Sequence, residues 1–209
     1  IASLPPAGLR KLLGDAYARV ASDLTDGLFM SSRDGVQFRR WNEAFIRPQR
    51  QDTGDLSGWM YGDNYQSYGL FPTTNEHGST EISFLVSQSY WQEYQSQSQR
   101  YSIRPDGFVS LQAKFGGGEC ITRPLVFDGN KLSVNYATSA AGSLTIELLD
   151  TDKKPIEGFT INDSIELIGN SLDQIVPWDA DKLKALAGTP VRIRFVLKDA
   201  DLYSFQFQK

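Results

Sequence analysis

The feature that most constrains the fold of this chain is a period-two alternation of apolar and polar residues in its second half. Five segments show it: residues 108–113, 132–138, 144–149, 191–198 and 202–208. In the second of them, Leu132, Val134 and Tyr136 alternate with small or polar residues. Such segments bury one face and expose the other, as strands of antiparallel sheets do. Many short strands with little helix predict an all-β fold, an antiparallel β-sandwich of jelly-roll-like type.

We expect residues 104–209 to form this sandwich as two packed antiparallel sheets. The apolar positions of the alternation predict a core that contains Val134, Tyr136, Ile146, Leu148, Ile193, Phe195, Phe205 and Phe207. Turns are expected at residues 128–130, 141–143 and 150–155, which are rich in Asp, Gly and Pro. A short helix is predicted over residues 181–187, with Asp179 or Asp181 as its N-cap and Gly188 and Pro190 ending it.

Residues 1–103 have a different texture and are predicted to be a separate region. Near the start, Leu9, Leu12, Leu13, Tyr17 and Val20 have the spacing of one helix face, which predicts a short N-terminal helix. From Gly27 the chain shows short β-like runs, and the Asp34-Gly35 pair favours a tight hairpin turn between residues 28 and 41. A further strand is expected at residues 81–86, so the boundary between the two regions falls near residue 103.

Composition and charge exclude several classes of protein. The chain has 21 Lys and Arg residues against 25 Asp and Glu, which gives a net charge of −4. This balance argues against a nucleic-acid partner, because such proteins carry a basic patch. No apolar run approaches the roughly 20 residues that span a bilayer, so no membrane partner is expected. A single cysteine, Cys120, excludes an intrachain disulfide and a multi-cysteine zinc site.

Three segments resemble a known family. Residues 25–38, which contain Ser32-Arg33-Asp34-Gly35-Val36-Gln37-Phe38, resemble the SxDGxxF blade hairpin of five-bladed β-propeller proteins related to glycoside hydrolases. Residues 104–111 and 187–205 resemble the sandwich domain that follows the propeller in a group of bacterial proteins. The resemblance implies that residues 1–103 are a partial propeller-blade region and residues 104–209 the sandwich.

The resemblance also implies what this chain lacks. A five-bladed propeller needs more residues than precede the sandwich here, so the chain would hold the last blade or so. The catalytic Asp of such glycosidases usually lies on the first blade, and no residue here matches it. The start at Ile1 predicts either a removed signal peptide or a piece of a longer chain. An extracytoplasmic location is expected because polysaccharides are mostly processed outside the cell. Unpaired blade edges predict a homo-oligomer or association with the rest of a propeller.

A cluster of aromatic and short polar residues between positions 59 and 71 is the candidate carbohydrate site. Trp59 and Tyr61 would stack on sugar rings, while Asp63, Asn64 and the single histidine, His77, would bind hydroxyl groups. The alternative is that these aromatic residues fill the core between blades. His77 is equally consistent with an exposed loop residue, and one histidine allows no two-histidine metal site.

Carboxylates supply the remaining candidates. Glycoside cleavage needs two carboxylates about 5 Å or about 6.5–9.5 Å apart. Asp63, Glu76 and Glu81 are the candidates in the blade region, and Glu81 is assigned to the carbohydrate site as well. No cofactor is predicted, with one alternative: Asp106, Asp199 and Asp201 flank the first and last sandwich strands, where a structural calcium ion would be bound by oxygen ligands. These three carboxylates are equally consistent with capping turns.

Three interpretations of function follow. In the first, the chain is a carbohydrate-associated portion of a glycoside-hydrolase-like protein, non-catalytic by itself, that contacts glycan and packs on a propeller. In the second, it is a complete glycoside hydrolase that uses a carboxylate pair. In the third, it is a scaffold or interaction domain with no role in sugar binding. The first is preferred because the resemblance is broad and a catalytic set is absent.

The first interpretation predicts that Trp59→Ala weakens glycan binding. Removing one stacking ring should cost about 1–3 kcal/mol of binding free energy, by analogy with aromatic stacking on nucleic-acid bases. A glycan array probed with the parent protein and the variant measures this. Binding that is unchanged in the variant would exclude Trp59 from the site.

Overall fold

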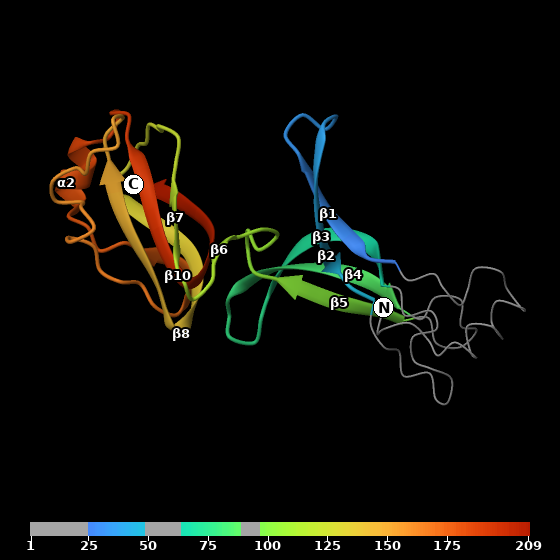
Figure 1. Ribbon diagram of the computed structural model, residues 1–209. Coiled ribbons are helices and arrows are strands. Elements are labelled where there is room, and N and C mark those ends of the chain that lie inside the picture. Colours follow the sequence, from blue (N-terminus) through green and yellow to red (C-terminus); the bar gives the residue numbers. More distant parts are fainter. Residues whose placement is uncertain (1–24, 49–63, 89–96) are drawn as a thin grey trace, which may run out of the picture. The chain divides into compact units, whose positions relative to one another are not determined.

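The computed structural model describes residues 25–48, 64–88 and 97–209 (Figure 1). It is mostly β-structure arranged in antiparallel sheets, which confirms the all-β class. The chain divides into two compact units, Ile1–Ile103 and Arg104–Lys209, which we call unit 1 and unit 2. The helix predicted from Leu9 to Val20 lies outside the described residues. No helix in the described ranges has both the length and the apolar character needed to cross a bilayer.

Unit 1 contains two antiparallel sheets joined by a small apolar core. Its strands are β1 (Gly27–Ser32), β2 (Phe38–Ile46), β3 (Tyr65–Thr74), β4 (Thr80–Gln88) and β5 (Gln97–Ile103). Strands β1 and β2 pair as a hairpin, and β3, β4 and β5 form a three-stranded sheet in that order. Ile46 of β2 is buried with Phe84 and Val86 of β4, and the rings of Phe45 and Phe84 stack 6.0 Å apart. The strand predicted at residues 81–86 is therefore part of β4.

The predicted β1–β2 hairpin is confirmed, but its turn is wider than the sequence suggested. Five residues, 33–37, connect the strands. Of these only Gly35 has a positive φ, of 72°, whereas a two-residue primed turn of the Asn-Gly type needs two such residues. The Asp34 carboxylate holds the loop by accepting hydrogen bonds from the backbone N–H groups of Val36 and Gln37. These bonds lower the pKa of Asp34 to about 2.

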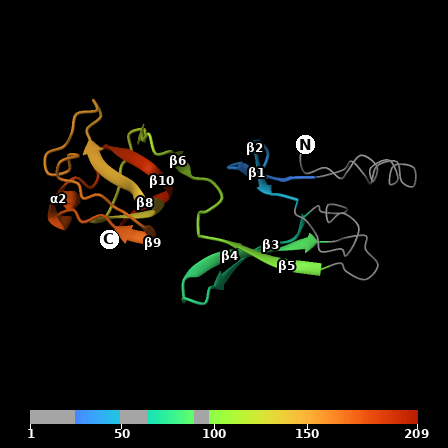
Figure 2. The same cartoon turned by 60° about the horizontal axis from the view of Figure 1, so that its bottom comes forward.

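Unit 2 is built on one five-stranded sheet that curls into a half-barrel. Its strands are β6 (Leu111–Ala113), β7 (Gly118–Ile121), β8 (Lys131–Leu149), β9 (Asn170–Ile175) and β10 (Arg192–Gln208). They follow the order β6-β10-β8-β9, and β7 also pairs with β10. Figure 2, a view turned from that of Figure 1, shows β8 and β10 lying side by side. The single sheet differs from the two packed sheets that we expected.

The difference comes from two long strands, each of which replaces two shorter strands that we had predicted. Residues 132–138 and 144–149 are halves of β8, and residues 191–198 and 202–208 are halves of β10. Residues 141–143, which we predicted to be a turn, lie inside β8. The small side chains there and a break in the strand pairing allow the long strands to bend instead of reversing. A curled sheet can then surround its own core.

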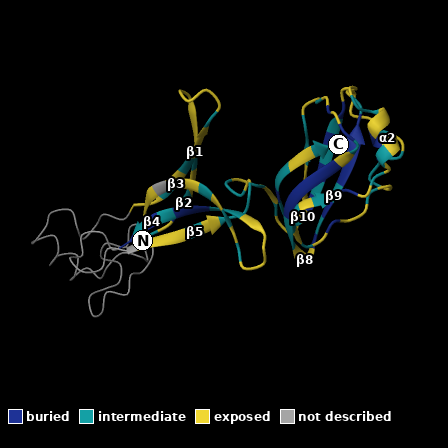
Figure 3. Cartoon of the chain, turned by 180° about the vertical axis from the view of Figure 1, so that it is seen from behind, coloured by how far each residue is buried: buried dark blue, intermediate teal, exposed yellow. Residues whose placement is uncertain are grey.

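The predicted alternation identifies this core well. Figure 3 shows buried residues along β8 and β10. Six of the eight predicted core residues are buried: Val134, Tyr136, Ile146, Leu148, Ile193 and Phe195. Phe207 is partly buried and stacks on Phe127, with ring centroids 3.9 Å apart, whereas Phe205 is exposed. The predicted short helix is confirmed as α2 (Ala180–Ala185), which contributes Leu183 to the core and is capped by the Asp179 carboxylate.

The outer face of the unit 2 sheet carries polar residues that are covered by other segments. Asn135 alternates with the core residues of β8, and its side-chain amide donates a hydrogen bond to the Pro105 carbonyl. Arg104 donates to the backbone carbonyls of Tyr136 and Ser171. Its guanidinium group also lies 4.2 Å from the ring centroid of Tyr203. These contacts anchor the first residues of unit 2 to its own sheet.

A buried carboxylate is neutralised on the same sheet. Glu147 of β8 is 1% exposed and lies opposite Arg194 of β10, whose Nη1 is 2.6 Å from the Glu147 carboxylate. The other Glu147 oxygen accepts a hydrogen bond from the Ile161 N–H. Arg194 also binds the exposed Glu119 of β7, and both acidic partners raise the pKa of Arg194. The arginine therefore links three neighbouring strands.

We predict that Arg194→Met destabilises unit 2. The substitution leaves the Glu147 carboxylate buried without its cation, which should lower the free energy of unfolding by about 3 kcal/mol. Urea unfolding at neutral pH measures this loss. In the control variant Glu119→Gln, loss of an exposed ion pair should cost less than about 1 kcal/mol. Equal losses in the two variants would contradict the proposed role of the buried pair.

Candidate functional site

The predicted carbohydrate cluster is only partly described. Trp59, Tyr61 and Asp63 lie outside the described residues, so their assignment stays a prediction. Asn64 is buried, and its amide Nδ2 donates a hydrogen bond to the Arg47 carbonyl, at a distance of 2.7 Å. Its side-chain oxygen is buried without a hydrogen-bond partner. In the described part of unit 1, Asn64 thus ties the start of β3 to the end of β2.

His77 and Glu81 have different surroundings. His77 lies in the exposed turn between β3 and β4, with Nε2 3.5 Å from the Glu76 carboxylate. The Glu81 side chain is only 15% exposed, and its carboxylate is 3.4 Å from Nη1 of Arg100 and accepts a hydrogen bond from the Thr73 hydroxyl. No hydrogen bond or ion pair between His77 and Glu81 is found in the described residues. Glu81 is therefore engaged by its own sheet.

The three carboxylates considered for calcium are also separated by their contacts. Asp106 accepts a hydrogen bond from the Ser204 hydroxyl at 2.6 Å. Asp201 accepts from the Ser110 hydroxyl at 2.6 Å and from the Gln112 amide at 3.2 Å. Within the described ranges, no three metal-binding side chains gather in one place. The contacts of Asp106 and Asp201 thus hold β6 and the segment before it against β10, a role that neither the calcium site nor the turn-capping alternative had anticipated.

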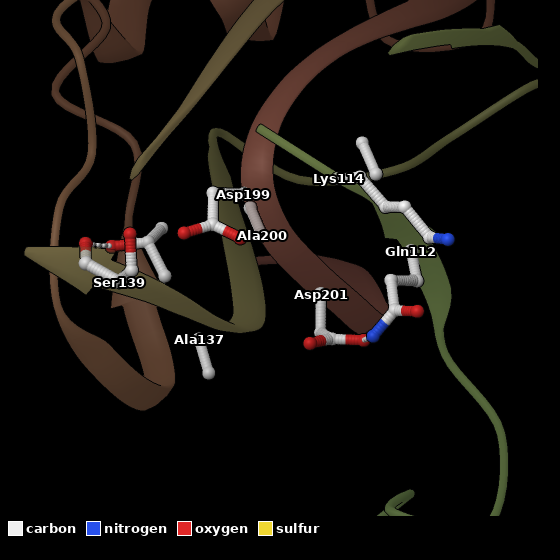
Figure 4. A pocket seen from close by; sticks show the side chains of 9 residues that line it. Gln112, Lys114, Ala137, Ser139, Asp199, Ala200 and Asp201 are labelled. Atoms are coloured by element: carbon white, nitrogen blue, oxygen red, sulfur yellow. Dashed lines mark hydrogen bonds between the residues drawn. The ribbon is translucent and has the colours of Figure 1, made fainter. Parts of the chain in front are cut away.

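Asp199 and Asp201 nevertheless line a cleft in unit 2 that we take as the candidate site (Figure 4). The cleft has a volume of about 340 Å³ and is formed by β6, the bend of β8 and the adjoining part of β10. Nine residues line it: Gln112, Ala113, Lys114, Ala137, Thr138, Ser139, Asp199, Ala200 and Asp201. Most of these side chains are polar, so the cleft is suited to a ligand with many hydrogen-bonding groups.

The cleft exists because the pairing of β8 and β10 is interrupted. Lys198 pairs with Ser143, but Ala200 already pairs with Thr138, so residues 139–142 of β8 bulge out. Asp199 within this irregularity has a φ of 42°, which is unusual for a residue with a side chain. Its N–H donates to the Lys114 carbonyl at 3.1 Å. A bulge redirects side chains that a regular strand would hold in line.

The polar groups of the cleft differ in how far they are already engaged. The Thr138 hydroxyl donates to the Ser139 carbonyl and accepts from the Gly169 N–H. The Gln112 amide binds one oxygen of Asp201. By contrast, the structure of unit 2, which is described in full, gives no hydrogen bond or ion pair to the side chain of Asp199 or Lys114. In Figure 4 the Asp199 carboxylate points into the cleft toward Ser139, and the Lys114 amine points away from it.

An exposed aromatic residue directly follows a residue that lines the cleft. Phe115 comes after Lys114 in the turn between β6 and β7 and is 62% exposed. The ammonium group of Lys198, the neighbour of Asp199, lies 4.7 Å from the centroid of the ring. Sequence reasoning missed this pair and the cleft. The available signal was a single aromatic residue in front of three glycines, 116–118.

Comparison with family models, with curated proteins and with solved structures gave no match to this chain. The propeller resemblance therefore stays a prediction.

We predict that Gly142→Ala disturbs the cleft. An added Cβ at this position would overlap the Asp199 carbonyl oxygen and lie 2.6 Å from that of Lys198. Relieving this overlap should cost about 1–3 kcal/mol of unfolding free energy. It should also shift the NMR signals of residues 198–200. Gly116→Ala is the matched control, because nothing lies within 4 Å of a Cβ there. Two variants of equal stability would contradict the close approach at Gly142.

Proposed function

We propose that this chain is a non-catalytic, carbohydrate-contacting protein and that unit 2 carries the contact site. The observation that carries the proposal is the polar cleft, whose lining residue Lys114 is directly followed by the exposed Phe115. The cleft volume of about 340 Å³ is at the lower end of the range of small-molecule sites. A cleft of this size can hold one or two sugar units, whereas it is too small to accept the surface of a protein partner.

The chemistry of the site matches the two faces of a sugar. Sugar rings present C–H groups that pack on aromatic rings, and hydroxyl groups that both donate and accept hydrogen bonds. Phe115 offers the aromatic surface. The Asp199 carboxylate offers acceptors, and the Ser139 hydroxyl offers a donor and an acceptor. Because Asp199 lies in β10 and Ser139 in β8, two paired strands of one sheet, their positions are held by the fold and little ordering is needed on binding.

Several contacts support binding over cleavage. Glycoside hydrolysis needs two carboxylates that act together across the scissile bond. In the cleft, Asp201 is bound by Ser110 and Gln112, while Asp199 has no such partner. In unit 1, Glu81 contacts Arg100 and Thr73. Hydrolysis of a glycoside by the pure protein, abolished by Glu81→Gln, would favour the complete hydrolase instead.

The wider setting of the protein is also a proposal. The SxDGxxF segment forms a hairpin whose Asp34 organises the turn, as a blade hairpin would require. This supports a role beside a propeller, supplied by a longer chain or by further copies of this one. An extracytoplasmic location agrees with contact to polysaccharide.

We predict that Phe115→Ala weakens glycan binding. The test begins with a glycan array and continues with NMR titration of the best ligand. Loss of the ring should cost about 1–3 kcal/mol, an increase in Kd of roughly 5- to 150-fold. Val126→Ala is the matched control, since Val126 is 61% exposed in the same unit and does not line the cleft. If both variants bind like the parent protein, the Phe115 site is excluded.

A further inference from the structure

Asp199 differs from the other partly buried carboxylates of unit 2. Those that are at least partly buried there are Glu147, Asp150, Asp199 and Asp201. Glu147 is paired with Arg194, Asp150 accepts from the N–H groups of Asp152 and Lys154, and Asp201 accepts from two side chains. Of these four side chains in the fully described unit, only that of Asp199 has neither a hydrogen bond nor an ion pair.

An unpaired carboxylate in a cleft makes a specific demand on a ligand. A carboxylate only accepts hydrogen bonds, and its desolvation is unfavourable unless a donor or a cation replaces the lost water. A second carboxylate, Asp201, lies two residues away and lines the same cleft. Lys114 is the single cation among the nine lining residues, and its amine points away from Asp199 (Figure 4). The formal charge of the lining, two acids and one base, is therefore −1.

The rim adds a second constraint. It consists of Phe115 and Lys198, the chain neighbours of the lining residues Lys114 and Asp199. The Lys198 ammonium lies over the Phe115 ring, so this cation is engaged by the ring while the Asp199 carboxylate is unpaired. A ligand that stacks at the rim should bring its own cation to the interior position. Among sugars, the group that does this is the protonated amine of an amino sugar.

We infer that the ligand of the cleft is an amino sugar with a free, protonated amine, which binds the Asp199 carboxylate while its ring packs against Phe115. The inference rests on the proposed carbohydrate function and narrows its substrate class. Charge-assisted hydrogen bonds are about twice as strong as neutral ones, so the amine contact sets the preference between sugars. An N-acetylated or neutral sugar satisfies Asp199 less well because its donors carry no charge.

The experiment is a calorimetric and NMR titration of the whole chain with three matched oligosaccharides: glucosamine, N-acetylglucosamine and glucose oligomers of equal length. At mildly acidic pH, where its amines are protonated, the glucosamine oligomer should bind about tenfold tighter than the other two, as one charged hydrogen bond implies. The preference should shrink at high salt and disappear at alkaline pH, where the amine loses its proton. Shifted NMR signals should include those of residues 112–115 and 198–201.

Two variants separate this contact from an effect on folding. Asp199→Asn keeps the shape of the side chain and should reduce the preference for glucosamine to near parity. Asp173→Asn makes the same charge change at an exposed position of β9 that does not line the cleft, and should leave the preference unchanged. Urea unfolding of both variants verifies that each is folded.

The outcomes distinguish the inference from the proposed function. If all three sugars shift the NMR signals of the cleft residues and bind with equal affinity, the amino-sugar inference is overturned and the carbohydrate function stands. No response of these signals to any sugar would overturn both. A last titration uses Ca²⁺ alone. If Ca²⁺ binds at Asp199 and the protein shows no preference for the glucosamine oligomer, the inference is also overturned.

Discussion

The antiparallel pairing of β8 with β10 is the constraint on which unit 2 depends. The two strands run beside each other from Arg192 and Leu149 at one end to Gln208 and Lys131 at the other. Their inward residues form most of the core, and every other strand of the sheet is hydrogen-bonded to one of them. The break in their pairing bends both strands, and the bend allows one sheet to enclose a core.

The outer face of this sheet shows how such a curled fold tolerates buried polar groups. Glu147 and Asn135 alternate with core residues, so the register that buries the core also places them on the outer face. Each is then given a specific partner, Arg194 and the Pro105 carbonyl respectively. A slip of one residue would bury unpaired polar groups and expose the core. The polar contacts thus favour one register more strongly than apolar packing does alone.

The features that depend on the local period of the sequence, the strands and their core residues, were predicted correctly. The features that depend on which distant strands pair were not. Alternation identified six buried core residues and the strand character around them, because a buried face imposes that pattern directly. It could not show that Ala141, Gly142 and Ser143 continue a strand, because small residues are equally typical of turns. It also could not show that Asp199 and Gln112, 87 residues apart, line one cleft. Their meeting depends on strand order, which the period-two pattern does not contain.

The same break in the pairing of β8 and β10 therefore shapes both the cleft and the core. It places different requirements on the residues of the two sides of the sheet. Inside, Ala200 is buried and pairs in register with Thr138 and Ala113, so the strand recovers its regular geometry within one residue of the bulge. Outside, Asp199 keeps a positive φ, which is unfavourable for a side-chain-bearing residue and is maintained by the surrounding contacts. Gly142 is needed because its backbone passes directly against Asp199. An unfavourable backbone that presents an unpaired carboxylate to a cleft does little for stability, and a role in binding gives it a physical reason.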